Sequence, residues 1–93
     1  MKDYIPVVIK VIPQDNFHVH VTFDDGKVID YDATADLQTK LFEPLRDINI
    51  FKETCTIMND TLVWDITGNR DNGNCIDIDP FTLYEMECIS EKE

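Results

Sequence analysis

The stretch FHVHVTFDDGKVIDYD, residues 17–32, decides the fold because two apolar runs flank a turn sequence. In its first half every second residue is apolar, beginning with the first, which is the period-two pattern of a half-buried strand. The tripeptide DDG at 24–26 is a typical turn sequence. We therefore predict a β-hairpin whose strands are Phe17–Phe23 and Lys27–Asp32.

The length of this turn determines which residues pair across the hairpin. A two-residue loop would place Val21 beside Asp30 and put a carboxylate on the core face. A three-residue loop, with Gly26 in the left-handed conformation, pairs Val21 with Ile29 instead. The apolar pattern favours the three-residue loop.

Outward from the hairpin, the preceding and following segments predict one strand and one short helical region. Ile5–Ile12 is rich in Val and Ile, which predicts a strand covered on both faces. Residues 33–38 have the polar composition of a connection. Pro44 excludes a long helix, so we expect one or two turns, of 3₁₀ type, that bury Phe42 and Leu45.

A second hairpin is predicted in the middle of the chain. Its strands are Glu53–Met58 and Thr61–Asp65, joined by a two-residue loop at 59–60. This register pairs Cys55 with Trp64, and it keeps the paired apolar residues on one face.

A polar loop, a short strand and a closing helix are predicted for the C-terminal part. The loop spans Thr67–Asn74, and Ile76–Ile78 alternates as a short final strand would. Asp79 suits an N-cap and Pro80 a first helical position, before helical turns over Phe81–Met86. We expect both aromatic residues of this helix to pack in the core.

These elements predict one domain over residues 1–93. Its class is α+β and mostly antiparallel: two hairpins, an N-terminal strand, a short C-terminal strand, a short central helical turn and a short C-terminal helix. We expect residues Ile89–Glu93 to fray at the terminus.

The charge balance restricts the class of partner. The chain has 19 Asp and Glu against 8 Lys and Arg, a net charge of −11. This charge repels nucleic-acid phosphates and anionic membrane surfaces, so neither is predicted as a direct partner. The second half carries most of the excess acid, which favours another small, basic protein as the partner.

The three cysteines indicate the compartment. Cys55, Cys75 and Cys88 are odd in number and widely spaced, which favours free thiols in a reducing cytoplasm. We expect Cys55, opposite Trp64, to be buried and inert. No apolar run approaches the roughly 20 residues that a membrane span requires.

Four residues of the first hairpin form a candidate metal or catalytic set. The predicted register places Asp30 opposite His20 and Asp32 opposite His18. Two imidazoles and two carboxylates are ligands that zinc or manganese accepts. The other interpretation is a solvent-facing set of cross-strand charge pairs.

Three carboxylates of the second half are candidate partner-binding residues. Asp65, Asp77 and Asp79 converge if the strand that ends at Asp65 neighbours the strand that holds Asp77. The sequence contains no nucleophile elbow, phosphate-binding loop, dinucleotide loop or C-x-x-C motif. We therefore predict no enzymatic activity and no cofactor.

Five short motifs together resemble a known family. They are VTFDDGK at 21–27, LFEPLRD at 41–47, LVWD at 62–65, DIDP at 77–80 and LYE at 83–85. In this order they resemble the domain of unknown function 2442 family of small bacterial proteins, from about Val7 to Glu85. The resemblance implies a compact, mostly antiparallel α+β domain with no assigned reaction. It also implies an antitoxin-like role beside a second small protein.

Two functions stay open at this point. The first is a non-enzymatic protein-interaction module, antitoxin-like in a toxin–antitoxin pair. The second is a small metal-binding or catalytic domain that uses the face formed by His18, His20, Asp30 and Asp32. The sequence also leaves the oligomeric state open, including association through a sheet edge.

Overall fold

The computed structural model describes residues 4–68, 75–86 and 88–90, which form two antiparallel sheets and four short helical segments. In chain order the elements are β1 (Val8–Pro13), β2 (His18–Phe23), β3 (Val28–Asp32), the 3₁₀ segments η1 (Asp36–Gln38) and η2 (Lys40–Arg46), α1 (Ile48–Thr54), β4 (Cys55–Met58), β5 (Thr61–Trp64), β6 (Ile76–Asp77), α2 (Pro80–Tyr84) and β7 (Cys88–Ser90). The strand orders are β1-β2-β3-β7 and β4-β5-β6. The predicted α+β class is confirmed.

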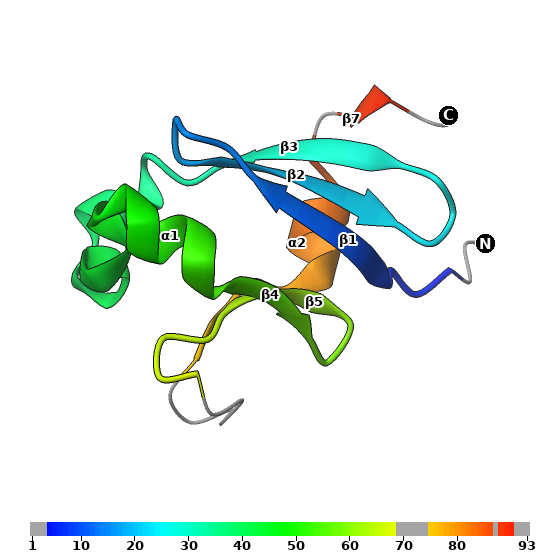
Figure 1. Ribbon diagram of the computed structural model, residues 1–93. Coiled ribbons are helices and arrows are strands. Elements are labelled where there is room, and N and C mark those ends of the chain that lie inside the picture. Colours follow the sequence, from blue (N-terminus) through cyan, green and yellow to red (C-terminus); the bar gives the residue numbers. More distant parts are fainter. Residues whose placement is uncertain (1–3, 69–74, 87, 91–93) are drawn as a thin grey trace.

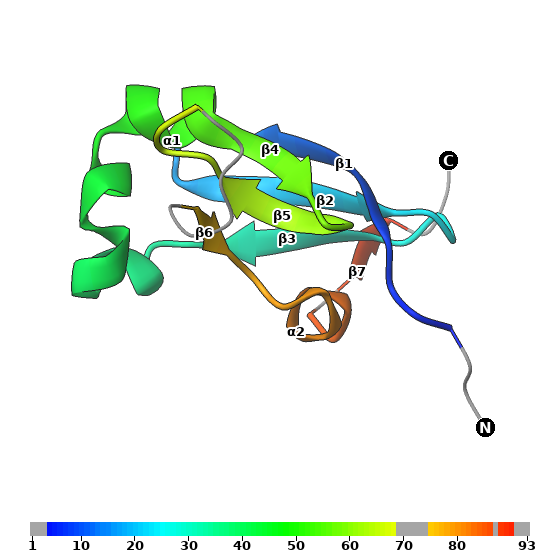
Figure 2. The ribbon, with the colours of Figure 1, turned by 90° about the horizontal axis from the view of Figure 1, so that it is seen from below.

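The two sheets pack against each other with the core between them. Figure 1 shows the four-stranded sheet above β4 and β5, with α1 and the 3₁₀ segments at one end. Figure 2, seen from below, shows β4 and β5 in front of the four-stranded sheet, while α2 lies on the side of β3 and β7. One face of the four-stranded sheet therefore packs on the core, and the opposite face, which we call its outer face, points away from the core.

The first hairpin has the predicted register. Val21 pairs with Ile29 across β2 and β3, and Gly26 has a φ of 97°, which the three-residue loop requires. The first strand begins one residue later than predicted, at His18. Phe17 has a φ of 67°, a left-handed conformation that cannot continue a strand.

The second hairpin also has the predicted loop and pairing. Cys55 pairs with Trp64, and the two loop residues Asn59 and Asp60 have φ values of 54° and 67°. Two consecutive left-handed residues are the signature of a type I′ turn, whose twist matches that of the flanking strands.

The helical region between the hairpins was only partly predicted. The 3₁₀ segment η2 contains Pro44 and buries Phe42 and Leu45, as expected. The predicted polar connection before it instead contains η1 and the buried Leu37, so that prediction was wrong. The strand predicted from Glu53 was also too long, because α1 occupies its start; the side chain of Asp47 caps that helix.

Three expectations at the chain's ends and edges are corrected. The first strand is not covered on both faces: Ile9 is 55% exposed and Ile12 is 43% exposed. The strand β6 pairs with β5 but is not the final strand, because β7 follows and pairs with β3. Residues 89 and 90, which we expected to fray, therefore belong to a strand that pairs with β3. Residues 91–93, and residues 69–74 of the predicted polar loop, lie outside the described residues.

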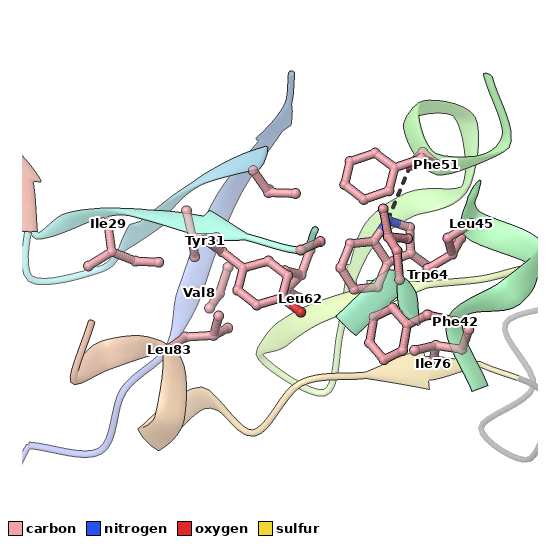
Figure 3. Close-up of a cluster of buried hydrophobic side chains, with 14 of the residues drawn as sticks. Val8, Ile29, Tyr31, Phe42, Leu45, Phe51, Leu62, Trp64, Ile76 and Leu83 are labelled. Atoms are coloured by element: carbon pink, nitrogen blue, oxygen red, sulfur yellow. Dashed lines mark hydrogen bonds between the residues drawn. The ribbon is translucent and has the colours of Figure 1, made fainter. Parts of the chain in front are cut away.

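Trp64 lies at the centre of the core, where both sheets and the helical region meet (Figure 3). Its ring has no exposed surface, and the ring centroids of Tyr31, Phe42 and Phe51 lie 6.1, 5.8 and 5.4 Å away. The indole N–H donates to the carbonyl of Phe51, at 3.1 Å. Leu83 of α2 is fully buried in the same core and holds α2 against it.

Candidate functional site

The four predicted candidates of the first hairpin do come together, on the outer face of β2 and β3. Asp30 lies opposite His20 and Asp32 opposite His18, as predicted. The Nδ1 atom of His18 lies 2.8 Å from Oδ2 of Asp30, and its Nε2 atom lies 3.4 Å from Oδ1 of Asp32. The Nε2 atom of His20 lies 3.6 Å from Oδ1 of Asp30.

These contacts form a line of alternating acids and imidazoles. The order along the line is Asp32, His18, Asp30 and His20. The two imidazoles therefore lie next to different oxygen atoms of Asp30, His18 next to Oδ2 and His20 next to Oδ1. A carboxylate only accepts, so Nδ1 of His18 carries the hydrogen of the 2.8 Å contact. Within residues 4–68, 75–86 and 88–90, no group of three or more His, Cys, Asp and Glu is placed to hold a metal ion.

Local hydrogen bonds stabilise the ionised form of one of these acids. The hydroxyl of Thr34 donates to Asp32 at 2.6 Å, and the Thr34 backbone N–H donates to the same oxygen at 2.9 Å. These bonds, the hydroxyl first, lower the pKa of Asp32. The carboxylate end of the line is therefore held in its charged form.

The three candidate carboxylates of the second half lie on neighbouring strands but have separate contacts. The strands β5 and β6 are paired, and we predicted that the three carboxylates would converge if these strands were neighbours. Asp65 is only 8% exposed; it accepts the N–H of Gly68 at 3.1 Å, and the thiol of Cys75 lies 3.5 Å away. Asp79 accepts the N–H of Phe81 at 3.0 Å as the N-cap of α2. Asp77 is exposed at the paired strand β6.

Helix α2 carries an exposed aromatic ring, and exposed acids lie at its two ends and on the preceding strand; we name Asp77, Asp79, Phe81 and Glu85 the α2 surface. Phe81 is 52% exposed, and the three acids are exposed as well. Phe81 and Glu85 are four residues apart, so both lie on one side of the helix. The expectation that Phe81 packs in the core was wrong.

The sequence contained a signal for this exposure. Leu83 lies two residues after Phe81, which places it about 200° further around a helix with 3.6 residues per turn. Once Leu83 is buried, Phe81 must face solvent. Tyr84 satisfies the core expectation in part: its ring packs edge-on against Phe23, with centroids 5.0 Å apart.

A small polar hollow lies where the first hairpin turn, α2 and β7 meet. It has a volume of about 320 Å³ and is lined by Asp25, Lys27, Tyr84 and Cys88. Lys27 Nζ donates to the Tyr84 carbonyl at 2.5 Å and lies 4.2 Å from the centre of its ring. The Tyr84 hydroxyl donates to Asp25 at 2.6 Å, and this bond is the main reason why the pKa of Asp25 is lowered. The network ties the turn to α2.

Three further observations bear on the nature of the chain. In the described part of the chain, no helix is long and apolar enough to cross a membrane. A family model described as Protein of unknown function (DUF2442) matches residues 8–87. No match was found among curated proteins or among solved structures.

Proposed function

We propose that the chain, which belongs to the family described as Protein of unknown function (DUF2442), is a non-enzymatic protein-interaction module that binds a small basic protein in the cytoplasm. The observation that carries this proposal is the exposed ring of Phe81 among the carboxylates of the α2 surface. A large apolar side chain with a charged rim is a common arrangement for a binding hot spot.

The charge around Phe81 favours a basic partner. Residues 75–86 contain three acids and no Lys or Arg. Lys27 reaches the last turn of α2, but its ammonium group is held by the carbonyl and ring of Tyr84. A surface of one sign steers partners of the opposite sign and raises their association rate.

The finer proposal is an antitoxin-like role, in which the α2 surface covers a basic surface of the partner. The net charge of −11 supports it, because a protein of this charge is suited to neutralise a basic one. We also propose that this contact requires no catalytic group of the chain.

Co-purification tests the proposal. The full-length, tagged chain is purified from its native host at physiological ionic strength, and associated proteins are identified by mass spectrometry. We expect one basic protein in stoichiometric amount, released by raising the salt concentration because charge attraction is screened. Recovery of the free chain alone would contradict the proposal.

A matched pair of variants tests the location of the contact. Phe81→Ala removes the exposed ring of the α2 surface, and we expect the partner's affinity to fall about tenfold or more. Ile9→Ala removes an apolar side chain of similar exposure, 55%, from β1. We expect this control to bind normally; equal effects of the two variants would place the contact elsewhere.

The second candidate function is a metal-binding or catalytic domain on the outer face of β2 and β3. One observation favours it: Oδ1 of Asp30 is buried and has no hydrogen-bond partner within the described residues, and His20 Nε2 lies 3.6 Å away. Titration with zinc and with manganese, followed through the imidazole NMR signals of His18 and His20, tests it. Unchanged signals at micromolar metal would exclude this function.

A further inference from the structure

We propose that strand β1 pairs edge to edge with β1 of a second copy of the chain, so that two four-stranded sheets join across a two-fold axis. In the strand order β1-β2-β3-β7, β1 has β2 as its one neighbour among the described strands, so its other edge is open to pairing. Strand β7, near α2, forms the opposite edge of the sheet (Figure 2). We call residues 9–13 the β1 edge.

The hydrogen bonds of the sheet show which backbone groups of β1 face outward. The N–H of Gln14 donates to the His18 carbonyl at 2.7 Å, and in an antiparallel ladder every second pair of residues is bonded in this way. Lys10 and Ile12 therefore bond to β2, whereas the N–H and C=O of Val11 point toward the open edge. A further strand offers both a donor and an acceptor to these two groups.

Exposed apolar side chains accompany these backbone groups. Ile9 and Ile12 lie on the β1 edge, and Ile5, just before the strand, is 68% exposed. Pairing of two such edges removes apolar surface from water at the same time as it satisfies the backbone. The β1 edge therefore has the two properties through which strands associate.

The distribution of charge selects a second copy of the chain as the occupant. Residues 4–14 are the longest stretch without Asp or Glu, and Lys10 is their one charged residue. Two copies with a net charge of −11 repel each other, and this repulsion is smallest where carboxylates are absent. A basic protein finds no carboxylate on this stretch, so charge steers it to the α2 surface instead.

Two-fold symmetry and the position of Lys10 define the register. The residue on a two-fold axis pairs with its own copy, so an axis at Lys10 would place two ammonium groups directly opposite each other, which is destabilising. An axis at Val11 lets each Val11 N–H donate to the other Val11 carbonyl. It also places Lys10 of one copy opposite Ile12 of the other, where the alkyl part of the lysine side chain covers the isoleucine.

The ends of the β1 edge keep the contact short and limit it to two copies. The register with β2 shifts between Val8 and Lys10, and Pro13 has no N–H to donate. The pairing is therefore centred on Val11, and each copy uses its β1 edge once, so the assembly closes as a dimer. A contact this short is smaller than a standard protein interface, and we expect a dissociation constant on the order of 10–100 µM.

Sedimentation equilibrium of the full chain, over concentrations that span this dissociation constant, tests the proposal. We expect a monomer–dimer equilibrium that shifts toward dimer as salt is added, because salt screens the repulsion between two acidic chains. Binding of a basic partner at the α2 surface should respond to salt in the opposite direction. Failure of one proposal is therefore distinguishable from failure of the other.

Amide hydrogen exchange measured by NMR locates the contact. Exchange of the Val11 amide should slow as the chain concentration rises, because pairing gives this N–H a carbonyl partner. The amide of Val21, which faces Ile29 of β3 inside the sheet, is the reference and should exchange slowly at every concentration. Exchange at Val11 that does not depend on concentration would overturn the proposal.

Two matched pairs of variants complete the test. Val11→Pro removes the outward N–H without removing a bond to β2, whereas Val11→Thr keeps that N–H. Ile9→Glu adds an acid to the β1 edge, and Phe81→Glu adds the same charge to a side chain of similar exposure on the α2 surface. The first member of each pair should weaken dimerisation about tenfold or more, and the second should dimerise as the original chain does.

Circular dichroism establishes that each variant is folded, and Ile9→Glu decides the outcome if Val11→Pro does not fold. A chain that stays monomeric at every concentration and salt level would overturn the proposal. So would a dimer that survives Ile9→Glu, a dimer that Phe81→Glu weakens equally, or growth beyond two copies.

Discussion

Trp64 holds β5, η2 and α1 together. It contacts the rings of Tyr31, Phe42 and Phe51, and its N–H donates to the Phe51 carbonyl. Phe51 lies in the last four residues of α1, where carbonyls lack partners within the helix. The indole therefore supplies both the largest buried side chain and a partner for a helix end.

Trp64→Phe should lower the free energy of unfolding by about 1–3 kcal/mol. The variant keeps an aromatic ring but leaves the buried Phe51 carbonyl without its donor. Urea unfolding followed by circular dichroism measures the change. The exposed Phe81→Leu is the control and should change stability by less than about 0.5 kcal/mol. Equal stability of the two variants would contradict the role assigned to the indole.

Asp60→Gly should stabilise the chain by about 0.5–1 kcal/mol. Asp60 has a φ of 67° in the type I′ turn, a conformation that costs a residue with a Cβ atom more than it costs glycine. The backbone carbonyl of residue 60 still accepts the N–H of Val8, at 2.9 Å. Thermal unfolding measures the effect, and Asp60→Asn controls for the lost charge. A lower melting temperature for the glycine variant would contradict this account of the turn.

The start of helix α2 is marked by residues in the local sequence, whereas strand β7 has no such signal. Asp79 and Pro80 mark the start of α2 in the sequence, and the structure has both in the predicted positions. Strand β7 has no comparable signal, because Cys88–Ser90 is too short for alternation to be visible. It forms a strand because its backbone pairs with β3.

Asp79→Ala should destabilise the chain by about 0.5–2 kcal/mol, the usual cost of losing an N-cap. The carboxylate of Asp79 accepts the N–H of Phe81 and thereby caps the first turn of α2. Asp77→Ala is the matched control: it removes an exposed acid from the adjacent strand and should cost less than about 0.5 kcal/mol. Chemical unfolding of both variants distinguishes capping from the loss of charge.

The stability of the whole molecule depends on packing between the two sheets. It also depends on pH, because some ionisable groups are shielded from water. Tyr31 is buried and Cys55 is half-buried, and both are neutral acids on the inner side of the fold. Desolvation raises the pKa of the Cys55 thiol from 9.0 to about 12, which supports the expectation that this thiol is inert, but the residue is half-buried and not fully buried as expected. Burial, with a hydrogen bond to Asp36 as the second cause, raises the pKa of Tyr31.

These shifts predict that the chain loses stability at alkaline pH. The contribution of Cys55 is fully present below pH 9.0, where the thiol is neutral in both states, and it is lost as the pH rises toward 12 because only the unfolded chain ionises. Tyr31 acts in the same direction from its ordinary pKa of 10.0 upward. The urea midpoint should therefore fall between pH 8 and pH 10.5.

A variant isolates the thiol's share of this effect. Cys55→Ala cannot ionise, so its urea midpoint should fall less steeply over the same pH range. Native-state alkylation of Cys55 at pH 8 should also be about 1000-fold slower than in the unfolded chain, because the thiolate fraction is that much smaller. Rapid alkylation of Cys55 in the folded chain would contradict the raised pKa of its thiol.

Local patterns determined both hairpins and the start of the closing helix. The alternation of residues 17–32 gave the register of β2 and β3, because a shift of one residue would turn every apolar side chain to the wrong face. The two-residue loop at Asn59 and Asp60 set the second hairpin in the same way. Turn geometry and face alternation depend on neighbours in the chain, so the sequence alone contained them.

The tertiary structure decided what depends on contacts between distant segments. Ile9 and Ile12 are apolar yet exposed, because the second sheet covers only one face of β1, and no local pattern states which face that is. Cys75, Met58 and Asp65 meet only when β5 pairs with both of its neighbours. The line of His18, His20, Asp30 and Asp32 was predictable from register, whereas the exposure of Phe81 followed from the packing of Leu83. Sheet packing and strand order are set by the global burial of apolar surface, which is a property of the whole chain and not of any segment.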